Sequence, residues 1–313
     1  LGNIFSNSGV TQTQYVCGPS GGGSKPCIGN NIPPFSANAA AQNNGLAGGQ
    51  MTVNTVTKDW NIPTAWKLSL GFDKELPWWG LVATVDYEHI DQRDAIYFKN
   101  LNLGAPMRVA PDGRANYFLT TGATNSTGQL SRANANPLFS GSTIELGNTS
   151  KGEADSLALS LKKNFSEDWS GMVGFTWSRS TEVNPGTSSV ASSNYNNNYV
   201  LNSNEDKAST SNYSTPRRVI AALTWQHAFF GNYNTTASVF YDGHSAAPYT
   251  WAFGNDANGD GITNDVAFVP KEGQVEFTPG TSAALQKSFY DYIQNNDYLK
   301  HEQGKTAQRN GDR

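Results

Sequence analysis

Residues 153–177 contain two runs of alternating apolar and polar side chains, separated by the polar turn Ser166-Glu167-Asp168. Every second residue of the first run is a leucine: Leu157, Leu159 and Leu161. The same spacing resumes after the turn, with aromatic, small or aliphatic residues at Trp169, Gly171, Val173, Phe175 and Trp177. A period of two predicts β-strands, because successive side chains leave opposite faces of the pleat. This stretch therefore predicts a hairpin with one apolar face.

The two tryptophans mark the ends of that apolar face. Trp169 and Trp177 are eight residues apart, which is roughly 20 Å of height for a strand tilted by about 40°. The apolar band of an outer-membrane barrel has a similar height between its aromatic girdles. A soluble β-sandwich also alternates, so this hairpin alone leaves both architectures open.

Two further hairpins have the same pattern. The apolar face of the first contains Trp66, Leu68, Leu70 and Phe72 on one strand and Leu81, Ala83, Val85 and Tyr87 on the other. The apolar face of the second contains Val219, Ala221, Leu223 and Trp225 on one strand and Ala237, Val239 and Tyr241 on the other. The opposite faces carry Lys67, Asp86, Glu88, Lys162, Arg218 and Gln226. Short turns alternate with long polar connections, which is typical of transmembrane barrels. We therefore predict an all-β fold, an antiparallel transmembrane β-barrel with short periplasmic turns and long extracellular loops.

The long connections have their own local signals. We expect residues 1–60 and 244–300 to be long extracellular loops, because they are polar and have little periodicity. Between the hairpins we expect a short strand at 95–101 and a turn at Asp112-Gly113. Apolar residues at helical spacing predict an amphipathic helix over 282–298.

Composition narrows the function. The 313 residues are 37% hydrophobic with a mean hydropathy of −0.52 and contain no run of about 20 apolar residues, so a helical membrane protein is excluded. The net charge of −4 gives no reason to expect nucleic acid as a partner.

Cys17 and Cys27 are the only cysteines and predict one local disulfide in an oxidising compartment. Both ends lead us to expect a segment of a longer protein, because the start lacks an initiator Met and a signal peptide and the end is polar.

The sharpest candidate site is a calcium motif. Asp256, Asn258 and Asp260 alternate and are followed by Gly261. Ile262 could add a backbone carbonyl, and Asn264 or Asp265 a further oxygen ligand. The twelfth position of the EF-hand pattern is Ala267, so the bidentate Glu is missing. The alternative is a tight Asx-rich turn without metal.

Enzyme chemistry has no comparable signal. The four histidines share no metal-ligand spacing, and no nucleophile elbow or phosphate loop is present. Asp86 and Glu88 share a face, but wall charge explains them better than a pair of hydrolytic carboxylates. We therefore expect no enzymatic activity and no certain cofactor, with calcium as the candidate ion.

Several segments resemble the barrel of TonB-dependent receptors, and more specifically the Oar-like (OmpA-related) branch of that family. The resemblance covers roughly residues 55–313. The segments that carry it are Lys151-Gly152-Glu153-Ala154-Asp155, Glu182-Val183-Asn184-Pro185, Thr215-Pro216-Arg217-Arg218-Val219, the 255–261 run leading to Val269-Pro270, and Arg309-Asn310.

This resemblance implies an outer-membrane receptor that binds a ligand through its extracellular loops. Residues 1–313 would be part of one barrel, without the signal peptide, plug and final strands that family members have. The implied partners are outer-membrane lipid, an unknown extracellular ligand, and the TonB–ExbB–ExbD complex, which would be reached through the absent N-terminal part. Two alternatives stay open: a passive porin or surface adhesin without energy coupling, and a soluble secreted β-rich binding module.

Overall fold

The computed structural model describes residues 53–119, 136, 139, 143–277 and 279–313. Its largest element is an antiparallel sheet of long strands in the order β12-β11-β9-β8-β3-β2. The strands are β2 (Ala65–Glu75), β3 (Leu81–Gln92), β8 (Glu153–Ser166), β9 (Trp169–Glu182), β11 (Arg217–Phe230) and β12 (Tyr233–His244), and β10 (Ser209–Thr210) pairs with the end of β9. All three predicted hairpins are thus confirmed.

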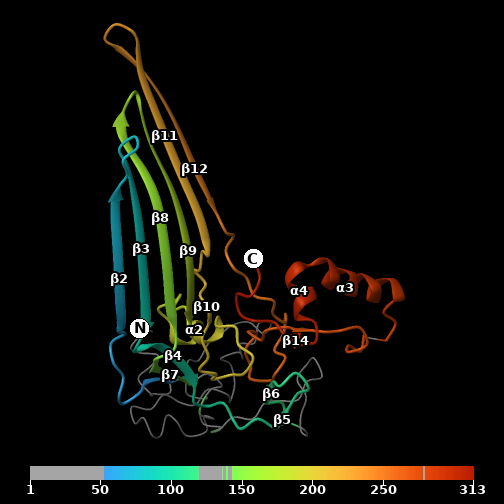
Figure 1. Ribbon diagram of the computed structural model, residues 1–313. Coiled ribbons are helices and arrows are strands. Elements are labelled where there is room, and N and C mark those ends of the chain that lie inside the picture. Colours follow the sequence, from blue (N-terminus) through green and yellow to red (C-terminus); the bar gives the residue numbers. More distant parts are fainter. Residues whose placement is uncertain (1–52, 120–135, 137–138, 140–142, 278) are drawn as a thin grey trace, which may run out of the picture.

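The hairpin turns are short and lie together at one end of the sheet (Figure 1). The β8–β9 connection is a two-residue turn in which Glu167 and Asp168 have φ values of 53° and 67°. Two central residues with positive φ are typical of the type I′ turn, whose twist matches that of the flanking strands. Asp168 tolerates this conformation better than most residues do.

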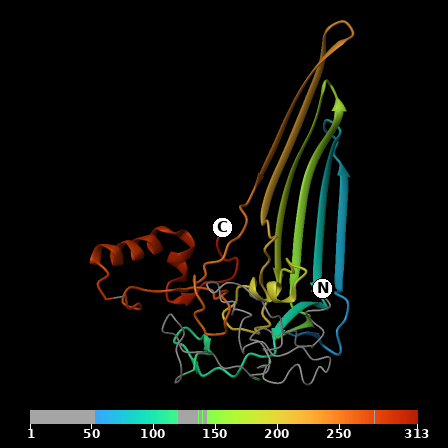
Figure 2. The same ribbon diagram turned by 180° about the vertical axis from the view of Figure 1, so that it is seen from behind.

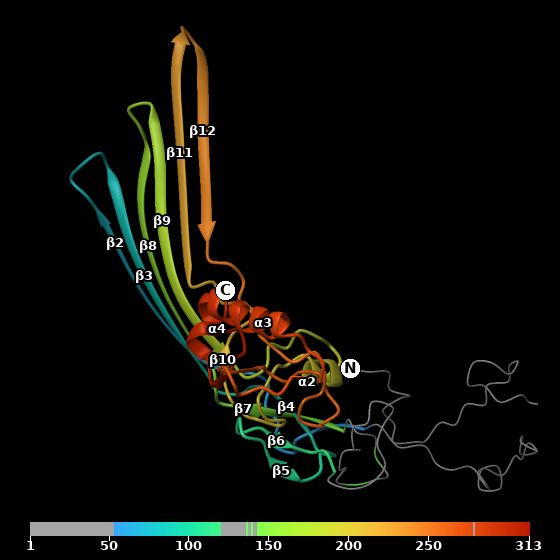
Figure 3. The same ribbon diagram turned by 90° about the vertical axis from the view of Figure 1, so that its right-hand side faces the viewer.

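The hairpins are staggered along the sheet (Figure 3). β8 continues for residues 164–166 beyond the Leu81–Lys163 pair, and β11 continues for residues 226–230 beyond the Trp169–Trp225 pair. A stagger of this kind is what tilted strands need to close into a barrel.

The sheet does not close among the described strands. β2 and β12 each have one edge without a neighbouring strand in this part of the chain. The predicted barrel is therefore seen here as an open, curved sheet. A lipid bilayer has no water to satisfy the backbone groups of such edges, so within a membrane both edges require further strands.

Smaller elements gather at the opposite end of the sheet (Figure 2). One is a three-stranded sheet in the order β1 (Asn54–Val56), β7 (Ile144–Thr149), β4 (Ala95–Asn100). Two are strand pairs: β5 (Arg108–Val109) with β6 (Ala115–Asn116), and β13 (Phe268–Val269) with β14 (Lys305–Thr306). The last is the helix α2 (Ala191–Asn196). The predicted short strand is confirmed as β4. The predicted turn joins β5 to β6, where Gly113 has a φ of 84° that glycine adopts without strain.

The predicted C-terminal helix is two helices. α3 (Ala283–Asn295) ends at Asn296, whose extended backbone starts α4 (Asp297–Glu302). The Asn296 side chain accepts a hydrogen bond from Leu299 N, so this residue caps the second helix. None of the helices in the described residues has the length and apolar character required to traverse a membrane.

Candidate functional site

The cross-strand register places the alternating apolar positions of the three hairpins on one surface, which we call the outer face. One row across the sheet consists of Phe72, Val85, Leu159, Phe175, Val219 and Gly243. Side chains directly opposite each other in neighbouring strands share a face. The three hairpins therefore form one continuous apolar surface rather than three separate ones.

No described segment covers the outer face. Leu159, Val173 and Val219 are 39%, 48% and 37% exposed, although all three lie within long, paired strands. Monomeric soluble proteins rarely expose apolar patches of this extent. The outer face is thus a surface that an apolar environment must cover, and the predicted sidedness of the strands is confirmed.

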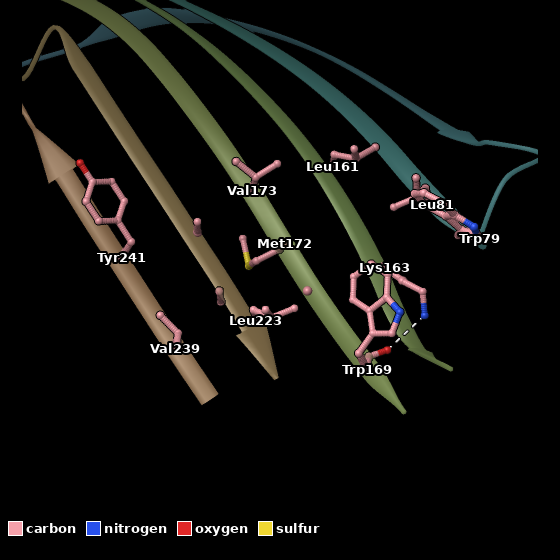
Figure 4. Close-up of a pocket in the computed structure, with 13 residues that line it drawn as sticks. Trp79, Leu81, Leu161, Lys163, Trp169, Met172, Val173, Leu223, Val239 and Tyr241 are labelled. Atoms are coloured by element: carbon pink, nitrogen blue, oxygen red, sulfur yellow. Dashed lines mark hydrogen bonds between the residues drawn. The ribbon is translucent and has the colours of Figure 1, made fainter. Parts of the chain in front are cut away.

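A shallow apolar groove of about 390 Å³ lies on the outer face near the turn end (Figure 4). Its walls include Leu161, Trp169, Val173, Leu223 and Tyr241. Gly171 has no side chain between two of these walls, where a Cβ atom would lie 3.5 Å from Leu223 Cδ1 and 3.6 Å from Trp169 Cζ3. The groove contains almost no polar surface, so its shape and chemistry suit an acyl chain.

Lys163 lies at the edge of this groove and is only 2% exposed. Its Nζ donates hydrogen bonds to the Ser166 carbonyl and hydroxyl, both at 2.7 Å, and to the Trp169 carbonyl at 3.1 Å. A β-bulge between Lys163 and Ser166 turns the side chain toward the hairpin end. The charge on this apolar face is thereby satisfied inside the protein.

The opposite surface, the inner face, carries the polar partners of the same strands. Lys67 pairs with Glu88 at 2.7 Å. Arg218 makes a bidentate contact with Asp242, at 3.0 and 2.6 Å. Exposed ion pairs like these add little stability, but they fit the wet lumen of a barrel, whose strands alternate apolar-out and polar-in.

The long connections fold into a compact unit at the loop end, which we call the loop cap. Its small apolar core joins four segments that are distant in sequence: Phe98, Ile144, Tyr195 and Ile262. Asn204 links the β9–β11 connection to β4, because its side chain accepts from Asn100 N at 2.7 Å and donates to Asn100 O at 2.9 Å. Burial raises the pKa of Tyr97, whose hydroxyl donates to the Asn204 carbonyl, to about 12. The described parts of the long connections thus pack together into one ordered unit.

The calcium-motif residues lie in this loop cap, and their side chains bond mainly to the backbone of their own loop. Asp256 accepts from Gly259 N at 2.6 Å and from Gly261 N at 2.8 Å. Asn258 Oδ1 accepts from Asp260 N at 2.8 Å, and Asp260 Oδ1 accepts from Ile262 N at 2.7 Å. Asp260 is 1% exposed, and burial raises the pKa of its carboxyl to about 6.

Asp265 is held differently. Its Oδ1 pairs with Arg114 Nη1 at 2.7 Å and its Oδ2 accepts from Ala257 N at 2.8 Å, so it anchors the motif to the β5–β6 hairpin. Among the described residues, no group of three or more His, Cys, Asp and Glu side chains is placed to hold a metal ion. Calcium binding at Asp256, Asn258, Asp260 and Asp265 stays a prediction. The predicted Cys17–Cys27 disulfide lies outside the described residues.

The histidines are dispersed. His89 Nδ1 lies 2.8 Å from Asp155 Oδ1, and His227 Nδ1 lies 2.7 Å from Asp168 Oδ2. His244 contacts the Ser245 carbonyl and His301 the Asp297 carbonyl. Each histidine therefore has a different hydrogen-bonding partner.

Two sequence motifs that are far apart meet in the structure. Arg309 is buried and donates to the backbone carbonyls of Glu182 and Val183, 127 and 126 residues away. Asn310 donates to the Thr210 carbonyl at 2.8 Å and to the Asn212 side chain. Sequence reasoning found both motifs but not their contact, since polar loops carry no periodicity that predicts a tertiary partner.

Comparison with known proteins agrees with the two-faced sheet. Searches of curated proteins and of solved structures found no match. A family described as "Outer membrane beta barrel domain" matches residues 2–306, which is nearly the whole chain. This match places the protein in the bacterial outer membrane and accounts for the uncovered apolar face. The chain belongs to the outer-membrane β-barrel domain family.

Proposed function

We propose that this chain is part of the barrel of a TonB-dependent receptor of the Oar-like type, which captures an extracellular ligand and has no enzymatic activity. The observation that carries the proposal is the joining of two resemblance motifs by Arg309, which docks the C-terminal segment onto the end of β9. The outer-membrane family alone does not distinguish a receptor from a porin. All five segments that suggest a receptor lie at the loop end or in the loop cap, close to where a ligand would arrive.

The loop cap offers surfaces for a ligand. A polar groove of about 800 Å³ lies along α3 and includes Lys271, Glu272, Lys287, Tyr290 and Asp291. Its mixture of charges and amide groups suits a polar ligand better than an apolar one. We propose that the receptor binds its cargo on this external side and passes it inward through the polar lumen.

Energy coupling is the part of the proposal that an experiment can address directly. The full-length protein, expressed from its own gene with a photo-crosslinking residue in its periplasmic N-terminal part, should crosslink to TonB in living cells. An established TonB-dependent receptor in the same cells serves as the control. If that control crosslinks and this protein does not, the receptor proposal is wrong.

A conductance measurement addresses the alternative. A receptor closed by a plug should give no steady current in a planar bilayer, whereas a passive porin should conduct continuously. Steady conductance by the full-length protein, together with absence of TonB crosslinks, would favour the porin. Absence of both TonB crosslinks and steady conductance would favour a surface adhesin.

A further inference from the structure

Two arginines lie on the outer face at its loop end, one level with Trp177 and one two residues beyond it. Arg217 is directly opposite Trp177 in the β9–β11 pair. Arg179 follows Trp177 by two residues in β9 and therefore has the same sidedness. Diagonal neighbours of this kind are roughly 7–8 Å apart. The two guanidinium groups thus start from adjacent positions at the height where the apolar band ends.

Within the described part of the chain, the protein leaves Arg217 unpaired and gives Arg179 one long ion pair. The Arg217 side chain is exposed and has no hydrogen bond or ion pair with the described residues. Arg179 is 62% exposed, and its Nη2 lies 3.5 Å from Glu153. Asp155, the cross-strand partner of Arg179, is already bonded to Tyr87 and His89.

Neighbouring cations behave differently. Arg218 points to the inner face and is paired with Asp242. Lys163, on the outer face at the turn end, uses its three ammonium donors within the protein. Arg217, with all its guanidinium donors free among the described residues, and Arg179, with a single long ion pair, therefore differ from the cations around them.

We propose that Arg179 and Arg217 bind the phosphate groups of a phosphorylated lipid in the external leaflet of the outer membrane. The side chains face the membrane, because the apolar surface that continues below them is the lipid-facing surface of this barrel family. Long loops mark the external side. A guanidinium group matches phosphate with paired donors, and Trp177 is the type of residue that positions a strand at the headgroup level.

The occupant is a lipid rather than a soluble anion because the site is continuous with the membrane-facing surface. The nearest acidic groups, Glu153 and Asp155, are on the β8 side, so the Arg217 side of the pair is open to a headgroup. This inference depends on the placement in the outer membrane and is independent of energy coupling or cargo.

The test uses the full-length protein, purified from outer membranes in mild detergent and examined by native mass spectrometry. The probe is diphosphoryl lipid A, with its dephosphorylated form as the comparison ligand. The double variant R179Q/R217Q should bind the phosphorylated lipid more weakly, by about fivefold for each arginine removed. R217Q alone should show an intermediate loss.

R218Q is the matched control, since it removes the adjacent arginine from the inner face. It should bind the lipid as the wild type does, and all variants should show the heat-modifiable gel mobility of a folded barrel. Equal lipid binding by wild type and double variant would overturn the proposal. Equal binding of the two lipid forms, or complete displacement by millimolar inorganic phosphate, would also overturn it. Should the double variant fail to fold, the same comparison between R217Q and R218Q decides the matter.

Discussion

Lys163 Nζ lies 4.2 Å from the centre of the Trp169 ring and donates a 3.1 Å hydrogen bond to the carbonyl of the same residue. The contact spans the two strands of the β8–β9 hairpin at the turn end of the outer face (Figure 4). A lysine on a lipid-facing surface is costly unless its ammonium reaches polar partners. Here the bulge and the turn carbonyls supply them.

Replacing this lysine should weaken the hairpin. K163M leaves the Ser166 and Trp169 carbonyls without their donor, and we expect the free energy of unfolding to fall by about 1–3 kcal/mol. The measurement is the temperature at which the folded band disappears on a heat-modifiability gel. K162M is the control, because Lys162 is exposed on the inner face. Equal shifts for both variants would show that the ammonium contacts contribute nothing.

The sidedness of the sheet predicts opposite outcomes for neighbouring positions. An arginine at Leu159 would face the middle of the apolar band and cost about 2–4 kcal/mol, whereas an arginine at Ser160 would face the lumen. L159R should therefore reduce the folded fraction recovered from outer membranes, and S160R should not. A reduced folded fraction for S160R but not for L159R would mean that the outer and inner faces are assigned the wrong way round.

Calcium binding is expected to be weak and to require the motif carboxylates. Calorimetric titration of the whole protein should give a dissociation constant of about 10⁻⁴–10⁻³ M, the range of extracellular calcium modules. D256N/D260N should abolish the heat of binding, and D297N, on exposed α4, should preserve it. The absence of heat from the wild type at millimolar Ca²⁺ would end the calcium prediction.

Asp312 should give the C-terminal segment a dependence on pH. Burial disfavours its carboxylate, but hydrogen bonds from Tyr249, Trp251 and Arg313 N outweigh burial and hold the pKa of Asp312 below its usual value. A pKa lowered in the folded state contributes stability that is present above the unfolded value of about 3.9 and is lost as pH falls through the folded value.

The readout is proteolysis of the C-terminal segment between pH 7 and pH 3, with an acid-tolerant protease. The wild type should become susceptible only below about pH 4. D312N should be susceptible already at pH 7 and show little further change, while D297N should follow the wild type. Identical profiles for D312N and the wild type would contradict this role for Asp312.

The sequence by itself determined the strands and their two faces. Alternation is a local property: once 157–161 and 169–177 are extended, a two-residue period decides which side chains lie together, and the short turns leave little choice of register. The hairpins, the exposed apolar face and the family placement all followed from this pattern.

Tertiary structure decided the contacts within the loop cap and which charged side chains have partners. Asn204 bonds to Asn100, 104 residues away, and Arg309 to carbonyls more than 120 residues away. Polar loops have no periodicity, so these partners depend on how separate connections meet in space. The same holds for Lys163 and Arg217: one ammonium is satisfied by a bulge, and one guanidinium remains open toward the membrane, because backbone geometry and not residue type sets which partners are within reach.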